Sequence, residues 1–282
     1  MRLTGAARLA GVVGWPIAHS LSPRLHGYWL GRYGIDGAYV PLGVRPADFE
    51  AAFRALPKLG FRGVNLTVPH KPAALGLVDE VDAMAARIGA VNTVVFDSDT
   101  GRSLGLNTDA PGFLASLRAG APDWRADAGP AVVLGAGGAA RAVVVALLDA
   151  GTPILRLVNR TRDRAETLAA RLGDGRVWVT EWRARADLLA DAALLVNTTT
   201  LGMTGAGALD LDLDALAGDA LVTDLVYSPL ETPLLAAARA RGNPVVDGLG
   251  MLLHQAAPGF AHWFGRTPEV DQGLRDAVAE GL

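Results

Sequence analysis

The 282-residue sequence predicts an α/β fold of two domains, each with its own largely parallel sheet. Short β-type runs alternate with helical segments along the whole chain, which is typical of α/β folds with parallel sheets. Residues 119–130 (AGAPDWRADAGP) interrupt this alternation with proline, glycine and polar residues, as a connector does. After the connector, an apolar strand runs directly into a glycine-rich turn and a helix, the start of a Rossmann-type doubly wound sheet.

The predicted elements follow in order. Before the connector, β-type runs predict strands at 9–14, 38–44, 63–68, 90–96 and 103–107, with helices from Pro23 and near 48–56. Residues 97–103 (DSDTGRS) are typical of a hairpin turn. After the connector, the alternation predicts strands at 131–134, 152–160, 176–180, 193–200 and 220–227, with one helix after the glycine-rich turn and another at 162–172. Two helical stretches, 250–264 and 270–280, end the chain.

The composition indicates a folded globular protein. Hydrophobic residues make up 50% of the chain, and the net charge of −3 comes without a basic stripe for nucleic acid or a polybasic arm for a membrane. The absence of cysteine excludes disulfides, thiol nucleophiles and cysteine-bound metals, and it fits a reducing compartment. The N-terminal segment is too polar for a signal peptide, and no apolar run reaches the length of a spanning helix. We therefore expect a cytoplasmic protein with no nucleic-acid or membrane partner.

Lysine is almost absent from this chain. Of the 26 cationic residues, 24 are arginine, and the two lysines are Lys58 and Lys71. Lys71 ends the segment NLTVPHK, beside an apolar strand. A desolvated lysine can lose its proton, whereas arginine effectively cannot. Lys71 is therefore a candidate for proton transfer, although codon bias would also leave a few lysines at random, which is our interpretation of Lys58.

A dinucleotide-binding motif opens the second half of the chain. Residues 135–141 read GAGGAAR, in which Gly135, Gly137 and Ala140 match G-x-G-x-x-A. The glycines permit a tight turn and close approach of a pyrophosphate, to which the helix N-terminus offers backbone N–H groups. A strand precedes the motif, and a helix and a second strand follow it, so the required order is complete.

The end of that second strand favours NADP over NAD. An acidic residue there would bind the ribose diol of NAD, whereas a cation accommodates the 2′-phosphate of NADP. The sequence instead places Asn159, Arg160, Thr161 and Arg164 in this region. Arg162 and Arg164 could also belong to the solvated face of the next helix, an interpretation that we keep for Arg162.

A nicotinamide cofactor implies hydride transfer, which requires a proton donor for the developing alkoxide. None of the four tyrosines is followed by lysine four residues later, so the tyrosine-lysine pair of short-chain dehydrogenases is absent. The chain has no cysteine for the usual zinc alcohol dehydrogenases, and its five histidines lack HExxH-type spacing, so we expect no metal. Lys71 remains as the donor, with His70 beside it as a rival.

Taken together, eight segments strongly resemble the shikimate dehydrogenase family. They cover most of the chain in the family's order: VGWPIAHSLSPRLH (13–26), NLTVPHK (65–71), GAVNTV (89–94), NTD (107–109), GAGGAAR (135–141), NRT (159–161), DLVYSPLETPLL (224–235) and GLGMLLHQA (248–256). The resemblance implies an NADP-dependent enzyme of aromatic amino acid biosynthesis, with 3-dehydroshikimate and shikimate as its small-molecule substrates.

The resemblance also implies a domain division and roles for individual residues. Residues 1–108, completed by C-terminal helices at 248–282, would bind substrate, and residues 109–247 would bind NADP. Lys71 matches the catalytic lysine, and Asp109 matches its carboxylate partner. The remaining substrate-binding matches are Ser20, Ser22, Thr67, Asn92, Tyr227 and Gln255. The cofactor-binding matches are Gly135, Ala136, Gly137, Gly138, Ala139, Asn159, Arg160, Thr161, Arg164, Thr198, Leu225, Gly248 and Met251.

Helix capping offers a competing explanation for some of these residues. Asn107, Thr108 and Asp109 all precede a helix, and any of them could be its N-cap. Ser22 before Pro23 has the pattern of an N-cap followed by proline, whereas Ser20 has no such role. The family often has phenylalanine where His70 stands, which leaves a second titratable group beside the lysine.

Other functions remain open at this point. A quinate/shikimate dehydrogenase shares the substrate signature but tends to prefer NAD, and the cations after Val158 argue against it. A regulator that had lost turnover would be suggested by loss of Lys71 or Asp109, and both are present. A folate-linked reductase would use a different lysine motif, and a glutamyl-tRNA reductase would use a cysteine nucleophile. The sequence allows either a monomer or a homodimer.

Overall fold

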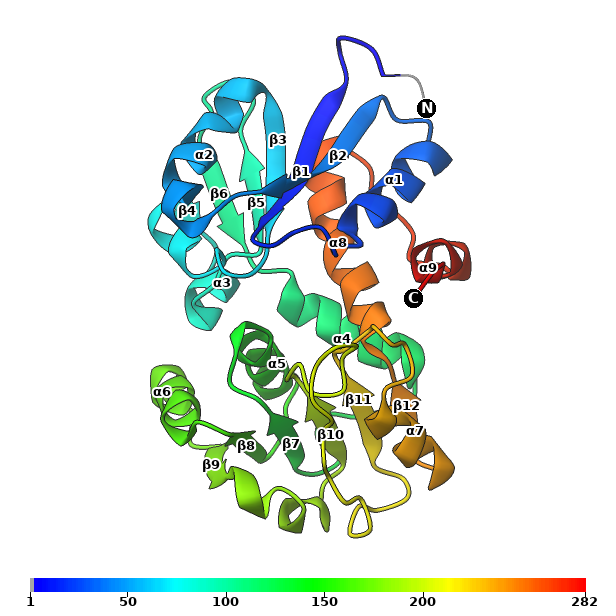
Figure 1. The fold of residues 1–282 in the computed structure, drawn as a ribbon. Helices are drawn as coiled ribbons and strands as arrows, with labels where there is room; N and C mark the ends of the chain where they lie inside the picture. Colours follow the sequence, from blue (N-terminus) through cyan, green and yellow to red (C-terminus); the bar gives the residue numbers. More distant parts are fainter. Residues whose placement is uncertain (1–2) are drawn as a thin grey trace. The chain divides into compact units, whose positions relative to one another are not determined.

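In the computed structural model, which describes residues 3–282, the chain forms two compact units. The first comprises the chain up to Asp109 together with Leu253–Glu280, and the second comprises Ala110–Leu252 and the last two residues. Each unit contains one six-stranded sheet (Figure 1). The predicted α/β fold with two sheets is therefore confirmed.

The sheet of the first unit has the strand order β2-β1-β3-β5-β6-β4. β1 pairs in parallel with β2 and β3, and β4 with β6, while β5 runs antiparallel to both β3 and β6. β5 is reversed because the predicted hairpin turn joins it directly to β6, and in this turn the Asp97 carboxylate accepts the backbone N–H of Thr100. The strands are Arg8–Gly14 (β1), Gly37–Gly43 (β2), Phe61–Leu66 (β3), Glu80–Val81 (β4), Thr93–Phe96 (β5) and Ser103–Leu106 (β6).

Two apolar clusters stabilise the first unit. Buried side chains of β1, β3 and β5 pack with Phe53 of α2. Trp29 of α1 and the rings of Phe260 and Trp263 of α8 surround the imidazole of His26, which is fully buried. The helices of this unit are α1 (Ser22–Arg32), α2 (Phe49–Ala55), α3 (Ala83–Ile88), the C-terminal part of α8 (Gly248–Phe264) and α9 (Gln272–Ala279).

The sheet of the second unit is entirely parallel, with the order β12-β11-β10-β7-β8-β9. Numbered from β7, this is the 3-2-1-4-5-6 order of the doubly wound dinucleotide-binding fold. The strands are Ala131–Leu134 (β7), Leu155–Asn159 (β8), Val177–Glu181 (β9), Leu194–Asn197 (β10), Leu221–Asp224 (β11) and Val245–Val246 (β12). The helices are α4 (Asp109–Gly120), α5 (Gly138–Asp149), α6 (Arg162–Leu172) and α7 (Pro233–Ala240).

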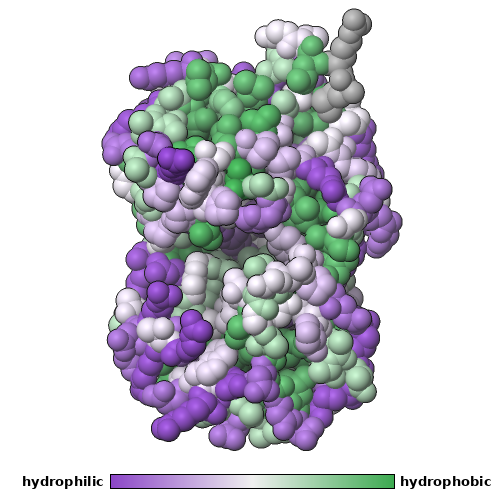
Figure 2. All heavy atoms as spheres, viewed as in Figure 1, coloured by the Kyte–Doolittle hydropathy of each residue, from purple (hydrophilic) through white to green (hydrophobic). Residues whose placement is uncertain are grey.

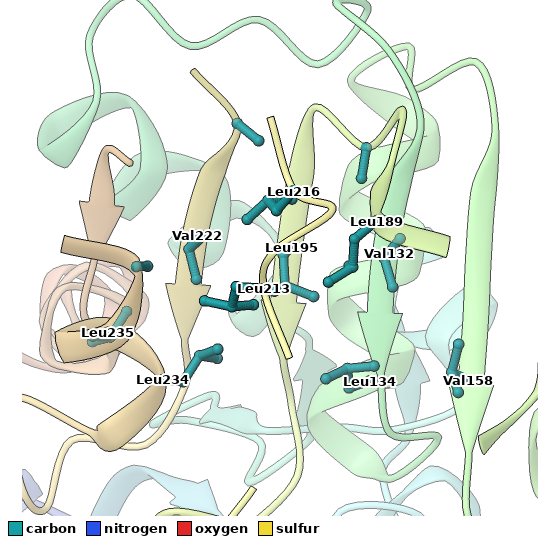
Figure 3. Close-up of a cluster of buried hydrophobic side chains, with 13 residues drawn as sticks. Val132, Leu134, Val158, Leu189, Leu195, Leu213, Leu216, Val222, Leu234 and Leu235 are labelled. Atoms are coloured by element: carbon teal, nitrogen blue, oxygen red, sulfur yellow. The ribbon is translucent and has the colours of Figure 1, made fainter. Parts of the chain in front are cut away.

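Aliphatic residues build the core of the second unit. Figure 3 shows side chains of β7, β8, β10 and β11 packed with Leu213, Leu216 and the α7 residues Leu234 and Leu235. On α5, every residue from Ala142 to Leu148 is buried, which accounts for the long apolar run after the glycine-rich turn. This core holds the C-terminal ends of the parallel strands, where dinucleotide sites form, in fixed positions.

The surface of the second unit is hydrophilic around α6, on the face that Figure 2 shows. The arginines at the start of this helix are exposed. Within residues 3–282, every helix is too short or too polar to span a membrane.

Candidate active site

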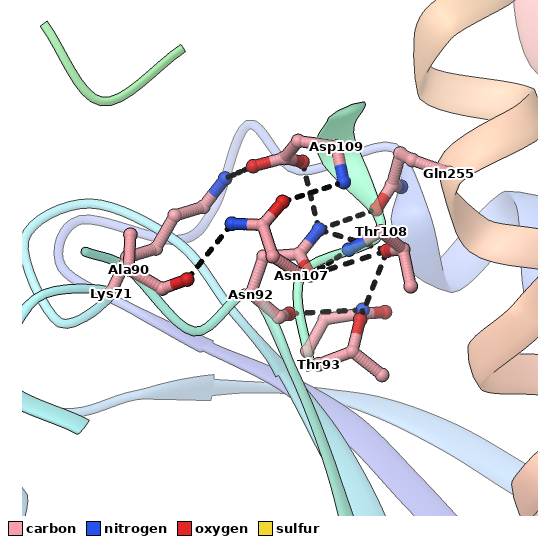
Figure 4. Close-up of polar contacts among 9 residues, drawn as sticks. Lys71, Ala90, Asn92, Thr93, Asn107, Thr108, Asp109 and Gln255 are labelled. Atoms are coloured by element: carbon pink, nitrogen blue, oxygen red, sulfur yellow. Dashed lines mark hydrogen bonds and ion pairs between the residues drawn. The ribbon is translucent and has the colours of Figure 1, made fainter. Parts of the chain in front are cut away.

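Lys71 and Asp109 face each other in the first unit. Lys71 Nζ donates a hydrogen bond to Asp109 Oδ2 at 2.6 Å, and the two side chains are 21% and 8% exposed (Figure 4). Lys71 follows β3 after a tight turn, in which the N–H of His70 donates to the carbonyl of Thr67. Its own carbonyl accepts the N–H of Val91 at 2.9 Å. Backbone hydrogen bonds on both sides of the turn therefore fix the lysine beside the carboxylate.

Asp109 is the first residue of α4, and its carboxylate binds two side chains, those of Lys71 and Asn92. The oxygen of Asn107 accepts the backbone N–H of Asp109 at 3.0 Å, and Asn107 Nδ2 donates to the carbonyl of Ala90 at 2.9 Å. Asn107 thus satisfies the first backbone N–H of α4. The Asp109 carboxylate binds Lys71 and Asn92, which favours the predicted role as the partner of the lysine over that of an N-cap.

Asn92 joins the ion pair to α8. Its Nδ2 donates to Asp109 Oδ1 at 2.8 Å and lies 3.4 Å from Gln255 Oε1, while its Oδ1 accepts the N–H of Thr108 at 2.8 Å. Asn92 immediately precedes β5, and Gln255 lies on α8. The structure therefore brings four of the predicted residues together, namely Lys71, Asn92, Asp109 and Gln255 (Figure 4).

His70 lies beside Lys71 in the sequence but points away from this cluster. Its ring is buried, stacks on Phe49 at 4.2 Å between centroids, and places Nε2 2.8 Å from the carbonyl oxygen of Val44. A ring nitrogen that donates to this carbonyl carries a proton, so the hydrogen bond fixes the tautomer. His70 packs α2 against the turn after β3, and this placement argues against its role as the rival proton donor.

The two serines occupy the start of α1 differently from the N-cap prediction. α1 begins at Ser22 itself, and its N-cap residue, Leu21, makes no side-chain cap bond. Ser20 Oγ accepts the backbone N–H of Ser22 at 3.3 Å, so Ser20 has the local turn role that we did not assign to it. Ser22 is buried, and its hydroxyl lies against the phenol of Tyr39.

Thr67 and Tyr227 complete the predicted substrate set. Thr67 follows β3, is half-buried, and donates its backbone N–H to the carbonyl of Val13 at 3.0 Å. Tyr227 belongs to the second unit, in the loop after β11, where burial raises the pKa of its phenol. The Thr67 side chain has no hydrogen bond to the Lys71–Asp109 pair among the described residues. Lys58, the other lysine, is exposed in the 3-10 turn before β3, at the opposite end of that strand from Lys71.

In the second unit, the glycine-rich turn has the geometry of a pyrophosphate cradle. Gly135 has a φ of +108°, and a Cβ at this position would lie 2.5 Å from Thr198 Oγ1. Gly137, the N-cap of α5, and Gly138, its first residue, are exposed and have open space where a Cβ would be. The lack of a side chain at these two glycines allows a pyrophosphate to come close to the backbone at the start of this 12-residue helix.

Thr198 closes the turn from the neighbouring strand. It follows β10, and both its N–H and its hydroxyl donate to the carbonyl of Leu134, at 2.9 and 2.7 Å. β7 lies between β8 and β10 in the sheet, so the turn lies where the strand order reverses. In open α/β sheets this reversal is where ligands bind. Ala136 lies in the same turn, and Ala139 is the second residue of α5.

The cations after β8 divide into paired and unpaired ones. Arg162 is bound to Glu166 at 2.6 Å and to Glu181 at 2.5 Å. Arg160 and Arg164 are exposed and have no ion pair within residues 3–282. Asn159 Nδ2 donates to the carbonyl of Thr161, the N-cap of α6, which holds the strand end in place. Two free arginines at this position suit a 2′-phosphate, whereas Arg162 belongs to the helix surface as expected.

The last cofactor-side matches lie after β11 and on α8. Leu225 donates its N–H to the carbonyl of Asn197 at 2.9 Å, and a Cβ on Gly248 would lie 2.4 Å from the carbonyl oxygen of Leu225. Gly248 therefore permits α8 to begin against this backbone. Met251 is half-buried one turn further along the helix.

Several buried polar residues near both sites were missed at the sequence level. In the second unit, the fully buried Asp224 accepts hydrogen bonds from Asn197, from the N–H of Val226 and from the hydroxyl of Thr232, and burial raises the pKa of its carboxyl. It thereby shapes the loop that carries Tyr227. In the first unit, the missed residues are Tyr39, Asn65, Thr93 and Thr108. The sequence feature that could have identified them is a polar side chain inside an otherwise apolar strand or next to a motif residue.

No group of three or more histidine, cysteine, aspartate or glutamate side chains within residues 3–282 is arranged to hold a metal ion.

Comparisons with known proteins agree with this geometry. Three family models match: the shikimate dehydrogenase substrate binding domain over residues 12–94, shikimate/quinate 5-dehydrogenase over 124–202, and the shikimate 5′-dehydrogenase C-terminal domain over 248–275. A curated relative from Paramagnetospirillum magneticum, named shikimate dehydrogenase (NADP(+)), is 62% identical over 98% of this chain and 99% of its own length.

Two solved structures are similar over almost the whole chain. Shikimate 5-dehydrogenase from Thermus thermophilus, in complex with NADP(H) and shikimate, is 40% identical, has a TM-score of 0.86, and covers 98% of this chain and 100% of its own. Quinate dehydrogenase from Corynebacterium glutamicum, in complex with NAD, is 35% identical, has a TM-score of 0.91, and covers 97% of this chain and 99% of its own. On the fold, the motifs and these full-length similarities, the chain belongs to the shikimate dehydrogenase family.

Proposed function

We propose that this protein is an NADP-dependent shikimate dehydrogenase that interconverts 3-dehydroshikimate and shikimate, in the biosynthesis of aromatic amino acids. The observation that carries the proposal is the partly desolvated Lys71–Asp109 pair, which Asn92 and Gln255 accompany. A regulator without turnover would have no use for such a pair. The relatives that are named as NADP-dependent shikimate dehydrogenases support the same activity for this chain.

In this proposal, Lys71 transfers the proton, and Asp109 holds the Lys71 side chain in place. Bound NADPH supplies the hydride that reduces the substrate carbonyl. The Lys71 ammonium passes a proton to the oxygen that gains negative charge, and in the reverse direction the neutral amine takes the proton from the substrate hydroxyl. Asp109 stays ionised and orients the amine. Acid/base assistance of this kind typically contributes on the order of 10² to 10⁴ in rate.

The other family-matched residues of the first unit would bind and orient the substrate. Asn92 and Gln255 offer amide groups to the substrate hydroxyls, and the Thr67 hydroxyl has no protein partner among the described residues, so it is available to a ligand. Ser20 and Ser22 are assigned to the substrate carboxylate, together with Tyr227 of the second unit. Neutral donors suit a ligand that has one carboxylate and several hydroxyls, because each hydroxyl both donates and accepts.

The residues of the second unit fit NADP. The backbone of Gly135–Ala139 and the start of α5 would hold the pyrophosphate, and Thr198 lies beside this turn. Arg160 and Arg164, with Asn159 and Thr161, would hold the 2′-phosphate. Leu225, Gly248 and Met251 are assigned to the nicotinamide side. This division supports residues 1–108 with 248–282 as the substrate domain and 109–247 as the cofactor domain, and the two compact units differ from it by only a few residues.

Steady-state oxidation of shikimate and quinate with NADP and with NAD tests the proposal. We expect the highest kcat/KM with shikimate and NADP, and a much lower value with NAD. A clear preference for quinate with NAD would instead identify a quinate dehydrogenase. The absence of a nucleic-acid partner and the state as a monomer or homodimer stay predictions, which sedimentation of the purified protein can address.

A further inference from the structure

A chain of buried hydrogen bonds leads across the first sheet to Asp109. It begins at Tyr39 on β2, passes Asn65 on β3 and Thr93 on β5, and continues through Thr108 to Asn92. Asn65 and Thr93 are direct partners in the pairing of β3 with β5. All five side chains belong to residues no more than 7% exposed, and Thr93 is 0% exposed. Water therefore does not compete for these bonds.

From Tyr39 to Thr108, the hydrogen bonds of this series can all be donated in the same direction. Asn65 Nδ2 faces two acceptors, Thr93 Oγ1 at 3.0 Å and the carbonyl of Asn92 at 3.2 Å, so Asn65 Oδ1 must accept from the hydroxyl of Tyr39 at 2.7 Å. Burial raises the pKa of Tyr39 and so maintains its phenol as a donor. Because Thr93 Oγ1 accepts from Asn65, its single proton is free to bond Thr108 Oγ1 at 3.1 Å.

The second half of the chain ends on the carboxylate. Thr108 Oγ1 contacts both ends of the Asn92 amide. It accepts from Nδ2 at 2.9 Å, and its own proton is directed to Oδ1 at 3.2 Å, which also accepts the N–H of Thr108. These two donors fix the orientation of the Asn92 amide, so that Nδ2 faces Asp109 Oδ1 at 2.8 Å (Figure 4). An ionised carboxylate can only accept hydrogen bonds, so this series of hydrogen bonds ends at Asp109. Lys71 binds the other oxygen, Oδ2.

We propose that Thr93 and Thr108 are positioning residues for Asp109: their hydroxyl pair orients the Asn92 amide, which holds Oδ1 and leaves Oδ2 for Lys71. This inference rests on the proposed acid/base role of Lys71 and Asp109. Aligned hydrogen bonds polarise one another in a buried site, so loss of one link weakens those that follow it. Thr93 is the cleanest probe, since a completely buried hydroxyl acts on a bound substrate only through its neighbours.

The test compares Thr93→Val, which keeps the shape of the side chain, with Thr93→Ser, which keeps the hydroxyl. For shikimate oxidation with NADP, we expect Thr93→Val to lower kcat about tenfold while KM for shikimate changes less than about threefold, because the variant leaves buried groups without their hydrogen-bond partner. Thr93→Ser should restore kcat to within about threefold of the wild type. If Thr93→Val is insoluble, Thr93→Ala is used in its place, because it removes the same hydroxyl.

A double-mutant cycle separates positioning from general destabilisation. In an Asp109→Asn background, Thr93→Val should change kcat less than about twofold, because residues that act through one another are not additive. Ser103→Ala is the matched control, since Ser103 is also buried and its hydroxyl donates to Asp79, but it lies at the end of β6 away from Thr93. It should lower the unfolding temperature and leave kcat unchanged.

The outcomes distinguish this inference from the proposed function. A wild-type protein that does not oxidise shikimate contradicts the proposed function itself. An active wild type overturns the inference alone if Thr93→Val has normal kcat, if Thr93→Ser fails to restore it, or if the loss is equally large in the Asp109→Asn background.

Discussion

Two unpaired arginines after β8 predict how this protein selects NADP. Arg160 and Arg164 are exposed and have no ion pair among the described residues, whereas Arg162, between them, is bound to two glutamates. A hydrogen bond to a charged group contributes about 1.5–3 kcal/mol, and 1.4 kcal/mol corresponds to a factor of ten. Exposure to water places each arginine at the low end of this range. The double substitution Arg160→Ala/Arg164→Ala should therefore lower kcat/KM for NADP on the order of 10- to 100-fold.

The assay is shikimate oxidation with NADP and with NAD, for the wild type, the double variant and Arg162→Ala. NAD lacks the 2′-phosphate, so kcat/KM for NAD should change less than about twofold in the double variant. Arg162→Ala, the matched control, should leave both values nearly unchanged, because this side chain is occupied by Glu166 and Glu181. An equal loss for NADP and NAD, or an Arg162→Ala effect as large as that of the double variant, would refute this account of cofactor choice.

Three further predictions follow from individual side chains. Gly135→Ala places a side chain at a φ of +108° and should lower both the unfolding temperature and the affinity for NADP. Gly137→Ala, at a position with open space for a Cβ, should lower only the affinity for NADP. Calorimetry with and without NADP separates the two effects, and equal stability of the two variants would contradict the geometry. Burial lowers the pKa of His26 from 6.5 to about 3, because the fully buried imidazole loses its contact with water, and neither ring nitrogen has a hydrogen-bond partner among the described residues. Because this pKa is lowered in the folded state, the contribution of His26 to the free energy of unfolding is full above about pH 6.5 and falls as the pH drops toward 3, by up to about 1.4 kcal/mol per pH unit. His26→Phe should reduce this fall, which thermal unfolding at pH 7 and pH 4.5 measures. His70→Phe should keep kcat within about twofold and lower the unfolding temperature modestly, since it loses one hydrogen bond and keeps the stacking on Phe49; a large loss of kcat would restore His70 as a proton donor.

Local patterns in the sequence predicted most elements well. The predicted helix at residues 162–172 matches α6, and the strand, glycine-rich turn and helix around Gly135 appear in the predicted order. These features depend on neighbouring residues: apolar periodicity, helix caps and the backbone freedom of glycine. The reversal of β5 was implied by its hairpin turn, although the overall pattern predicted mainly parallel pairing.

Side-chain directions were harder to predict, because they depend on contacts far away in the sequence. His70 looked like a rival to Lys71 until Phe49 and the carbonyl of Val44 were seen to hold its ring. The roles of Ser20 and Ser22 at the start of α1 were reversed, because the helix begins one residue earlier than the Ser-Pro pattern suggests. The series of hydrogen bonds from Tyr39 to Asp109 links residues up to 70 positions apart, and no local sequence pattern predicts it.

The kinetics of Lys71 variants test the central claim most directly. With shikimate and NADP, Lys71→Ala should lower kcat by about 10² to 10⁴ while KM for shikimate changes little, because the lost interaction belongs to the transition state. Lys71→Arg should fail to a similar degree, since arginine keeps the charge beside Asp109 but does not give up its proton. A near-normal kcat with a raised KM in Lys71→Ala would contradict the account and make Lys71 a binding residue only.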